Sequence, residues 1–182
     1  MAKANGAFMR SAGLLQGIGR WLGLSALIVV LDQVSKQVIL RGIEFGHQVE
    51  VLPPFFSLVL TYNPGAAFSF LATASGWQRY FFILIALAAS ALIIYMMVRH
   101  KGDRFLCFAL TLVLGGAVGN LIDRILHGAV VDFLLFRWPG GPALFNPWPA
   151  FNLADSCISI GAALLIWDSF RRSKVKAAET QP

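Results

Sequence analysis

The chain has 182 residues, of which 57% are hydrophobic and 13% are charged, and its formal net charge is +6. A soluble domain is about 25% charged, so this composition excludes an ordinary soluble protein and indicates a single-domain integral membrane protein. The positive charge does not indicate nucleic-acid binding, because the basic residues lie at the ends of apolar segments and not in a solvated stripe with interleaved aromatic side chains.

The N-terminal part predicts a basic arm and a first membrane span. Residues 1–20 form the arm and carry Lys3, Arg10 and Arg20 among small residues. Residues 21–40 follow; at 1.5 Å per residue they extend about 30 Å, the thickness of one bilayer core. We expect a retained span and not a cleaved signal peptide, because no A-x-A type of cleavage site follows.

Residues 41–77 differ in composition, since they are rich in glycine and proline. Between these breakers lie two short β-like runs at 48–52 and 56–62. The segment predicts a small extramembrane sheet on the membrane surface, followed by a turn that begins at Asn63 and Pro64.

Three further apolar segments predict three more spans. They cover residues 79–98, 105–126 and 151–170, and the second half of 105–126 contains glycines that permit close helix packing. A short basic loop joins the first two, a longer loop at 127–150 follows, and a basic tail covers 171–182. The expected fold class is an all-α integral membrane protein with four transmembrane helices and a small β-sheet on its outer face.

The basic residues also predict the orientation. Most lysines and arginines lie in the N-terminal arm, the loop after residue 98 and the tail, so the positive-inside rule makes both termini cytoplasmic. The segments 41–77 and 127–150 then face outward. With this topology four aspartates gather in the outer half of the membrane, namely Asp32, Asp123, Asp132 and Asp155.

Ionisable side chains at such a depth are costly and commonly mark function. Asn120, Asp123 and Arg124 share one helix face, where Asp123 can pair with Arg124 or with a cation on a neighbouring helix. Arg124 can instead extend to the interface and clamp the outer loop. Asp32 and Lys36 stand at i and i+4, which predicts a salt bridge within the first span.

Asp132 and Asp155 have apolar sequence neighbours and no adjacent cation. Two carboxylates brought close in such surroundings share one proton, as in aspartic proteases. The ionised group then takes a proton from water, while the protonated group binds the scissile carbonyl and later protonates the leaving amine. Two alternatives stay open on the residues alone: ion or proton transport, and a structural role in which Asp155 and Asn152 cap the fourth span.

Other kinds of chemistry are less consistent with the sequence. The histidines, His47, His100 and His127, are scattered, and no Cys/His cluster is present, so we expect no metal and no cofactor. A Ser-Lys dyad from Ser35 and Lys36 is excluded, because adjacent helical residues do not face each other.

Several short blocks stand in a fixed order: DQVSK at 32–36, NPGAAF at 63–68, GGAVGNLIDR at 115–124, GAVVDF at 128–133 and FNLADS at 151–156. Together they resemble the signature of the lipoprotein signal peptidases, the bacterial type II signal peptidases. The resemblance covers residues 20–172 and implies an intramembrane aspartic protease of the bacterial inner membrane.

The resemblance also implies a substrate and a set of roles. The substrate is a prolipoprotein with a diacylglyceryl group on its lipobox cysteine, cleaved just before that cysteine, and the cyclic peptide antibiotic globomycin occupies the same site. Asp132 and Asp155 match the catalytic dyad. The supporting positions of the signature are matched by Asn63, Asn120, Arg124 and Asn152, and further by Asp32, Lys36 and Asp123. We expect a monomer in contact with membrane lipids.

The main alternative function is a small ion- or proton-coupled transporter that uses Asp32, Asp123 and Asp155 as a relay. It is disfavoured because the sequence has no internal repeat and because these carboxylates are expected on one side of the membrane.

Overall fold

The computed structural model describes residues 17–65, 76–142 and 146–179, with no side-chain description for 174–179. In this part of the chain, four helices are long and apolar enough to cross a membrane. They are α2 (Gly19–Gly42), α3 (Trp77–Arg99), α4 (Arg104–Leu126) and α5 (Leu153–Glu179). The predicted membrane fold class is thus confirmed, and α5 continues well beyond the predicted end of its span at residue 170.

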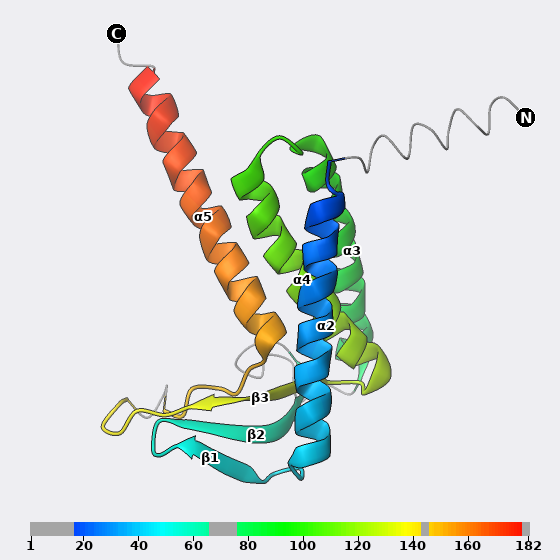
Figure 1. The fold of residues 1–182 in the computed structure, drawn as a ribbon, viewed down its shortest axis with the longest axis vertical. Helices are drawn as coiled ribbons and strands as arrows, with labels where there is room; N and C mark the ends of the chain where they lie inside the picture. The colour runs from blue at the N-terminus through cyan, green and yellow to red at the C-terminus, as the bar shows by residue number, and fades with distance from the viewer. Residues whose placement is uncertain (1–16, 66–75, 143–145, 180–182) are drawn as a thin grey trace, which may run out of the picture.

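The four helices run up and down, and the two ends of the described chain lie at the end opposite the sheet (Figure 1). At that end Asp103 caps α4 by accepting a hydrogen bond from the Leu106 amide at 3.0 Å, and Arg172 of α5 forms an ion pair with Asp103. Helix α4 packs against each of the other three helices. It is therefore the central element of the bundle.

The sheet at the other end has three antiparallel strands in the order β1-β2-β3. Strands β1 (Gln48–Leu52) and β2 (Phe56–Asn63) confirm the two predicted β runs. Strand β3 (Val130–Phe136) corrects the prediction that 127–150 is only a loop. The strand was missed because its first four residues are all buried, so it lacks the alternation that identifies a half-exposed strand.

The sheet is attached to the helices by a small apolar core. Ile39 of α2, Leu60 of β2 and Val131 and Phe133 of β3 are all buried in it. Antiparallel pairing places Asp132 opposite Thr61 and Val130 opposite Asn63. Burial of the strand thereby fixes Asp132 beneath the helix ends.

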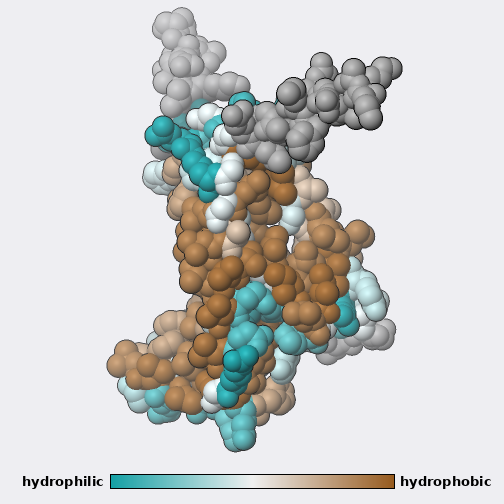
Figure 2. Space-filling model, turned by 45° about the vertical axis from the view of Figure 1, so that its right-hand side comes forward, coloured by the Kyte–Doolittle hydropathy of each residue, from teal (hydrophilic) through white to brown (hydrophobic). Residues whose placement is uncertain are grey.

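On the face shown in Figure 2 the helices are mainly apolar, and hydrophilic residues gather toward the two ends of the molecule. Large apolar side chains on this surface are at least half exposed in the isolated chain, among them Val38, Leu84, Ile160 and Trp167. A lipid environment accounts for such exposure, because helices of this length bury these side chains among acyl chains.

Candidate active site

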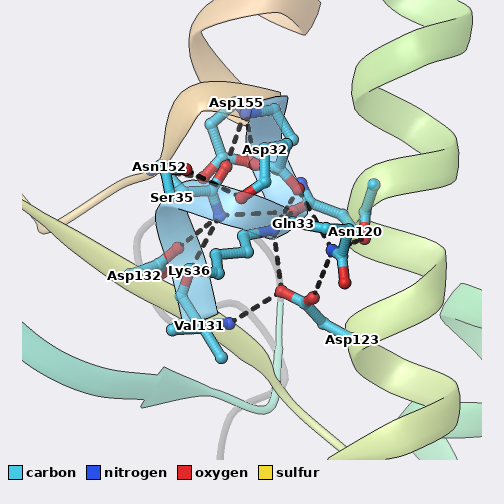
Figure 3. Close-up of polar contacts among 12 residues, drawn as sticks. Asp32, Gln33, Ser35, Lys36, Asn120, Asp123, Val131, Asp132, Asn152 and Asp155 are labelled. Atoms are coloured by element: carbon cyan, nitrogen blue, oxygen red, sulfur yellow. Dashed lines mark hydrogen bonds and ion pairs between the residues drawn. The ribbon is translucent and has the colours of Figure 1, made fainter. Parts of the chain in front are cut away.

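A connected set of polar side chains lies where the helices meet the sheet (Figure 3). All the site residues predicted from the sequence lie in this region. Helix α2 supplies Asp32 and Lys36; α4 supplies Asn120, Asp123 and Arg124; β2 supplies Asn63, β3 supplies Asp132, and the start of α5 supplies Asn152 and Asp155. Part of the predicted NPGAAF block, residues 66–68, lies outside the described residues.

A buried ion cluster joins α2 to α4. The Lys36 ammonium lies 2.8 Å from Asp32 Oδ2 and 2.7 Å from Asp123 Oδ2, and all three side chains are at most 2% exposed. Asp123 also accepts a hydrogen bond from the Val131 amide at 3.1 Å, which ties the start of β3 to α4. Removing one partner from such a cluster leaves a buried charge uncompensated and costs about 3–5 kcal/mol of stability.

The cluster settles how Asp123 is paired. The Asp32–Lys36 salt bridge predicted from the i, i+4 spacing is confirmed. The sequence left two kinds of partner open for Asp123. In the structure Asp123 pairs with Lys36 on the neighbouring helix α2, and not with the adjacent Arg124. The reason is geometric, since adjacent residues on a helix point in different directions.

The first turn of α5 is closed by hydrogen bonds to side chains. The Asn152 Oδ1 accepts from the Asp155 amide at 2.8 Å, and Asp155 Oδ2 accepts from the Asn152 amide at 3.3 Å, which is a reciprocal capping box. Asp32 Oδ1 accepts from the Ala154 amide at 2.9 Å. The capping role considered for Asn152 and Asp155 is therefore present, and the positive end of the helix favours a negative charge there.

Asp155 has one further partner, the Asn120 Nδ2, which donates to its Oδ1 at 2.7 Å. Both carboxylate oxygens of Asp155 thus accept a hydrogen bond from an N–H donor. Neither donor carries a charge, and no residue in the described part of the chain forms an ion pair with this carboxylate.

Asp132 has a different environment on β3. Its side chain is 2% exposed, and it accepts hydrogen bonds from Asn152 Nδ2 at 2.8 Å and from Asn63 Nδ2 at 3.3 Å. Burial, and then the negative charge of Asp155, raise the pKa of Asp132 to about 7. Asp132 is consequently the carboxyl group that can hold a proton near neutral pH.

Arg124 contacts the turn after β2. Its Nη2 donates to the Gly65 carbonyl oxygen at 3.0 Å, its Nη1 donates to the Asn120 carbonyl oxygen at 3.4 Å, and the guanidinium lies 5.0 Å from the centre of the Phe82 ring. Arg124 therefore clamps a segment at the sheet end, but this segment is the turn after β2 and not the 127–150 loop named in the prediction. It holds the Asn63-Pro64-Gly65 turn, in which Asn63 Oδ1 accepts from the Gly65 amide.

One member of the network was not predicted. Gln33 Nε2 donates to Asp123 Oδ1 at 2.8 Å, to the Gly119 carbonyl oxygen at 3.2 Å and to Asp32 Oδ2 at 3.3 Å. The sequence did contain a signal for it: Gln33 is a polar residue beside Asp32 within an apolar span. A polar side chain in such a span needs partners inside the protein. Among the described residues, no group of three His, Cys, Asp or Glu side chains is placed to hold a metal ion.

The carboxylates proposed for a transport relay, Asp32, Asp123 and Asp155, all lie at the sheet end of the bundle. Asp168 and Asp103 at the opposite end pair with Arg172. A relay would need carboxylates distributed across the bilayer, so the arrangement favours localised chemistry at the sheet end.

Known proteins match the chain over most of its length. A family model described as signal peptidase (SPase) II matches residues 24–171. The chain is 48% identical to the lipoprotein signal peptidase of Janthinobacterium sp. (strain Marseille), over 94% of this chain and 98% of the relative. It is also 48% identical to that of Ralstonia nicotianae, with the same coverage.

Two solved structures, each titled as a bacterial membrane enzyme structure by the in meso method, have the same fold. The 2.3 Å structure matches with a TM-score of 0.76 and 31% identity, over 87% of this chain and 92% of that one. The 1.9 Å structure matches with a TM-score of 0.71 and 33% identity, over 83% and 92% of the two chains.

Proposed function

The chain belongs to the signal peptidase II family, and from this premise we propose that it is an intramembrane aspartic endopeptidase acting on prolipoproteins. It removes the signal peptide from a precursor that carries diacylglycerol on its lipobox cysteine, and it cleaves just before that cysteine. The observation that carries the proposal is the pair Asp132 and Asp155: both contact Asn152, and neither has a cation as hydrogen-bond partner among the described residues.

The two carboxyl groups have different roles in this proposal. Asp155 is the ionised base, because it lies in the first turn of a helix and accepts two hydrogen bonds from uncharged donors. Asp132 carries the shared proton, because burial and the charge of Asp155 raise its pKa to about 7. Like charges at a shared site cannot both be ionised easily.

The cleavage step follows from these protonation states. Asp155 takes a proton from a water molecule, whose oxygen bonds to the scissile carbonyl carbon, while the Asp132 hydroxyl donates a hydrogen bond to the carbonyl oxygen. The proton of Asp132 then passes to the leaving nitrogen, and the C–N bond breaks to give a carboxylic acid and an amine. The dyad again holds one proton, now on Asp155, and its transfer to Asp132 restores the starting state.

The position of the dyad supports a lipidated substrate. It lies at the sheet end of apolar helices, so a cysteine bound there can keep its acyl chains in the bilayer beside them. The positive-inside rule places this end on the outer side of a bacterial inner membrane and both termini in the cytoplasm. One chain supplies both carboxyl groups, which is consistent with a monomer, and globomycin-like cyclic peptides are expected to compete for the site.

The test is cleavage of a diacylglyceryl-modified precursor peptide by the purified protein in detergent. Asp132→Asn and Asp155→Asn are each expected to reduce cleavage by at least about 100-fold, because each removes a general acid or base. Glu50→Gln, at an exposed position of β1, is the control and should cleave normally. Normal cleavage by either folded dyad variant would rule out the dyad, and equal cleavage of an unlipidated precursor would rule out the substrate class.

A further inference from the structure

Lys36 is the only fully buried lysine side chain in the described part of the chain, and it contacts neither Asp132 nor Asp155 through any hydrogen bond there. Besides its two carboxylate partners, its Nζ donates to Asn120 Oδ1 at 3.0 Å. Asn120 is in turn the side chain that donates to Asp155. This route connects the ion cluster to the proposed base through a single side-chain amide.

Donors and acceptors around Asn120 allow one orientation of that amide. Its Oδ1 faces two donors, Lys36 Nζ at 3.0 Å and Asn152 Nδ2 at 3.2 Å, and its Nδ2 faces Asp155 Oδ1 at 2.7 Å. An ammonium has donors only, and an ionised carboxylate has acceptors only. A flipped amide would place its NH₂ against the ammonium and its carbonyl against the carboxylate.

The neighbouring amide of Asn152 is fixed in a different way. Its Oδ1 accepts from the main-chain amide of Asp155, so its Nδ2 has to point toward Asp132. Backbone structure therefore orients Asn152. Within the described segments no main-chain amide donates to Asn120 Oδ1, so its orientation depends on Lys36 and on the Asn152 amide.

We propose that Lys36 is a positioning residue for the reaction: by holding Asn120 Oδ1 it keeps the Asn120 amide donating to Asp155, and so keeps Asp155 the ionised member of the dyad. This inference rests on the proposed function. Lys36 acts on Asp155 through the orientation of Asn120, and its own charge is opposed by Asp32 and Asp123 at 2.8 and 2.7 Å.

Other charged groups surround the hydrogen bonds from Lys36 to Asn120 and from Asn120 to Asp155, and four elements contribute them. Helix α2 contributes Asp32, α4 contributes Asp123 and Arg124, β3 contributes Asp132, and α5 contributes Asp155. A variant that tests the route has to leave the balance of these charges unchanged. Lys36→Met combined with Asp123→Asn does so, because it removes one positive and one negative charge together.

The experiment compares the pH dependence of kcat/KM for the lipidated precursor peptide. In K36M/D123N the acid limb of this profile should move up by about one pH unit, as expected for loss of a hydrogen bond to a charged group. K36R/D123N retains hydrogen-bond donors at position 36, so the acid limb of its profile should stay at the pH of the wild type. A purely structural role for Lys36 predicts an altered amount of folded enzyme with an unmoved limb in both variants.

Asn120→Ala supplies a second measurement that does not depend on the folding of the double variant. It should move the acid limb in the same direction, and adding K36M/D123N to it should move the limb no further. An unmoved limb in Asn120→Ala, or additive shifts, would overturn the inference. Failure of the proposed function is distinguishable, because Asp132→Asn and Asp155→Asn would then cleave normally.

Discussion

Asn152 and Asp155 hydrogen-bond each other reciprocally across the first turn of α5, at 2.8 and 3.3 Å. The same Asn152 side chain donates to Asp132 at 2.8 Å. The side chain that begins the helix is thus also the side chain that links the two carboxyl groups, through a different atom. Helix formation and assembly of the proposed dyad are consequently coupled, and one substitution can separate them.

Asn152→Ser is that substitution. Serine is as good an N-cap as asparagine, so its hydroxyl should preserve the start of α5 and leave the thermal unfolding temperature close to that of the wild type. It has no donor long enough to replace the bond from Asn152 Nδ2 to Asp132. Cleavage of the lipidated precursor is expected to fall about 10- to 100-fold, from loss of a hydrogen bond to a charged or polar reacting group.

Asn152→Ala removes both functions and is the matched comparison. It should lower the stability by about 1 kcal/mol in addition to the loss of cleavage, because the capping bond is lost. Unfolding temperature in detergent and cleavage rate are measured for both variants. Equal destabilisation by serine and alanine would contradict the capping role, and full cleavage by the serine variant would contradict the role at Asp132.

The pH profile of cleavage tests the protonation of Asp132. Burial and the charge of Asp155 raise the pKa of Asp132 to about 7, so the proton required on Asp132 is lost as the pH rises through neutrality. We expect kcat/KM to decrease above pH of about 7, with a slope of one proton. A rate that stays constant up to pH of about 9 would show that Asp132 does not supply the proton.

The same shift has a consequence for stability. The pKa of Asp132 is raised from 3.8, so between about pH 4 and pH 7 the folded protein holds a proton that the unfolded chain has lost. Its contribution to the free energy of unfolding is therefore full below about pH 4 and decreases as the pH rises through this window. Asp132→Asn should flatten this part of the stability curve, measured as unfolding temperature against pH.

The membrane architecture was predictable because apolar length alone identifies a span. The salt bridge between Asp32 and Lys36 was predictable because both residues lie on one helix. The sequence blocks GAVVDF and FNLADS, which contain Asp132 and Asp155, also indicated which two carboxylates to propose as a dyad. These are local properties, each carried by a few consecutive residues.

Long-range pairing was less accessible. Strand β3 pairs with β2 across about seventy positions of sequence, as in the register of Thr61 with Asp132, and its continuous burial hides the strand pattern. The contacts of Gln33 and Asp123 depend on how α2 and α4 face each other. Helix rotation is set by packing of whole faces and cannot be obtained from the spacing within either helix.

Treatment with a metal chelator should leave cleavage unchanged. The proposed mechanism needs only the two carboxyl groups and water, and the other two buried carboxylates of the site are already paired: Asp32 and Asp123 bind Lys36. The measurement is cleavage of the lipidated precursor after incubation with excess EDTA and after dialysis. Activity that disappears with EDTA and returns with a divalent cation would replace the aspartic mechanism by a metal-dependent one.

The close approach of α4 and α5 should make Gly116 intolerant of any side chain. A Cβ atom at this position would lie 2.3 Å from the Ala154 carbonyl oxygen and 2.7 Å from Ile158 Cγ1, so Gly116→Ala has to push the start of α5 away from α4. Overpacking of this kind costs about 1–3 kcal/mol. Because Asp155 lies on the displaced turn, cleavage should decrease more than the unfolding temperature alone explains.

Gly23→Ala is the matched control in the same bundle. A Cβ atom at Gly23 of α2 would meet nothing within 4 Å, so alanine should preserve cleavage and leave the unfolding temperature equal or slightly higher, given its better helix propensity. If Gly116→Ala behaves like Gly23→Ala in both measurements, α4 and α5 are not in the close contact that positions Asp155. If only Gly116→Ala loses cleavage, the distance between these two helices sets the geometry of the dyad.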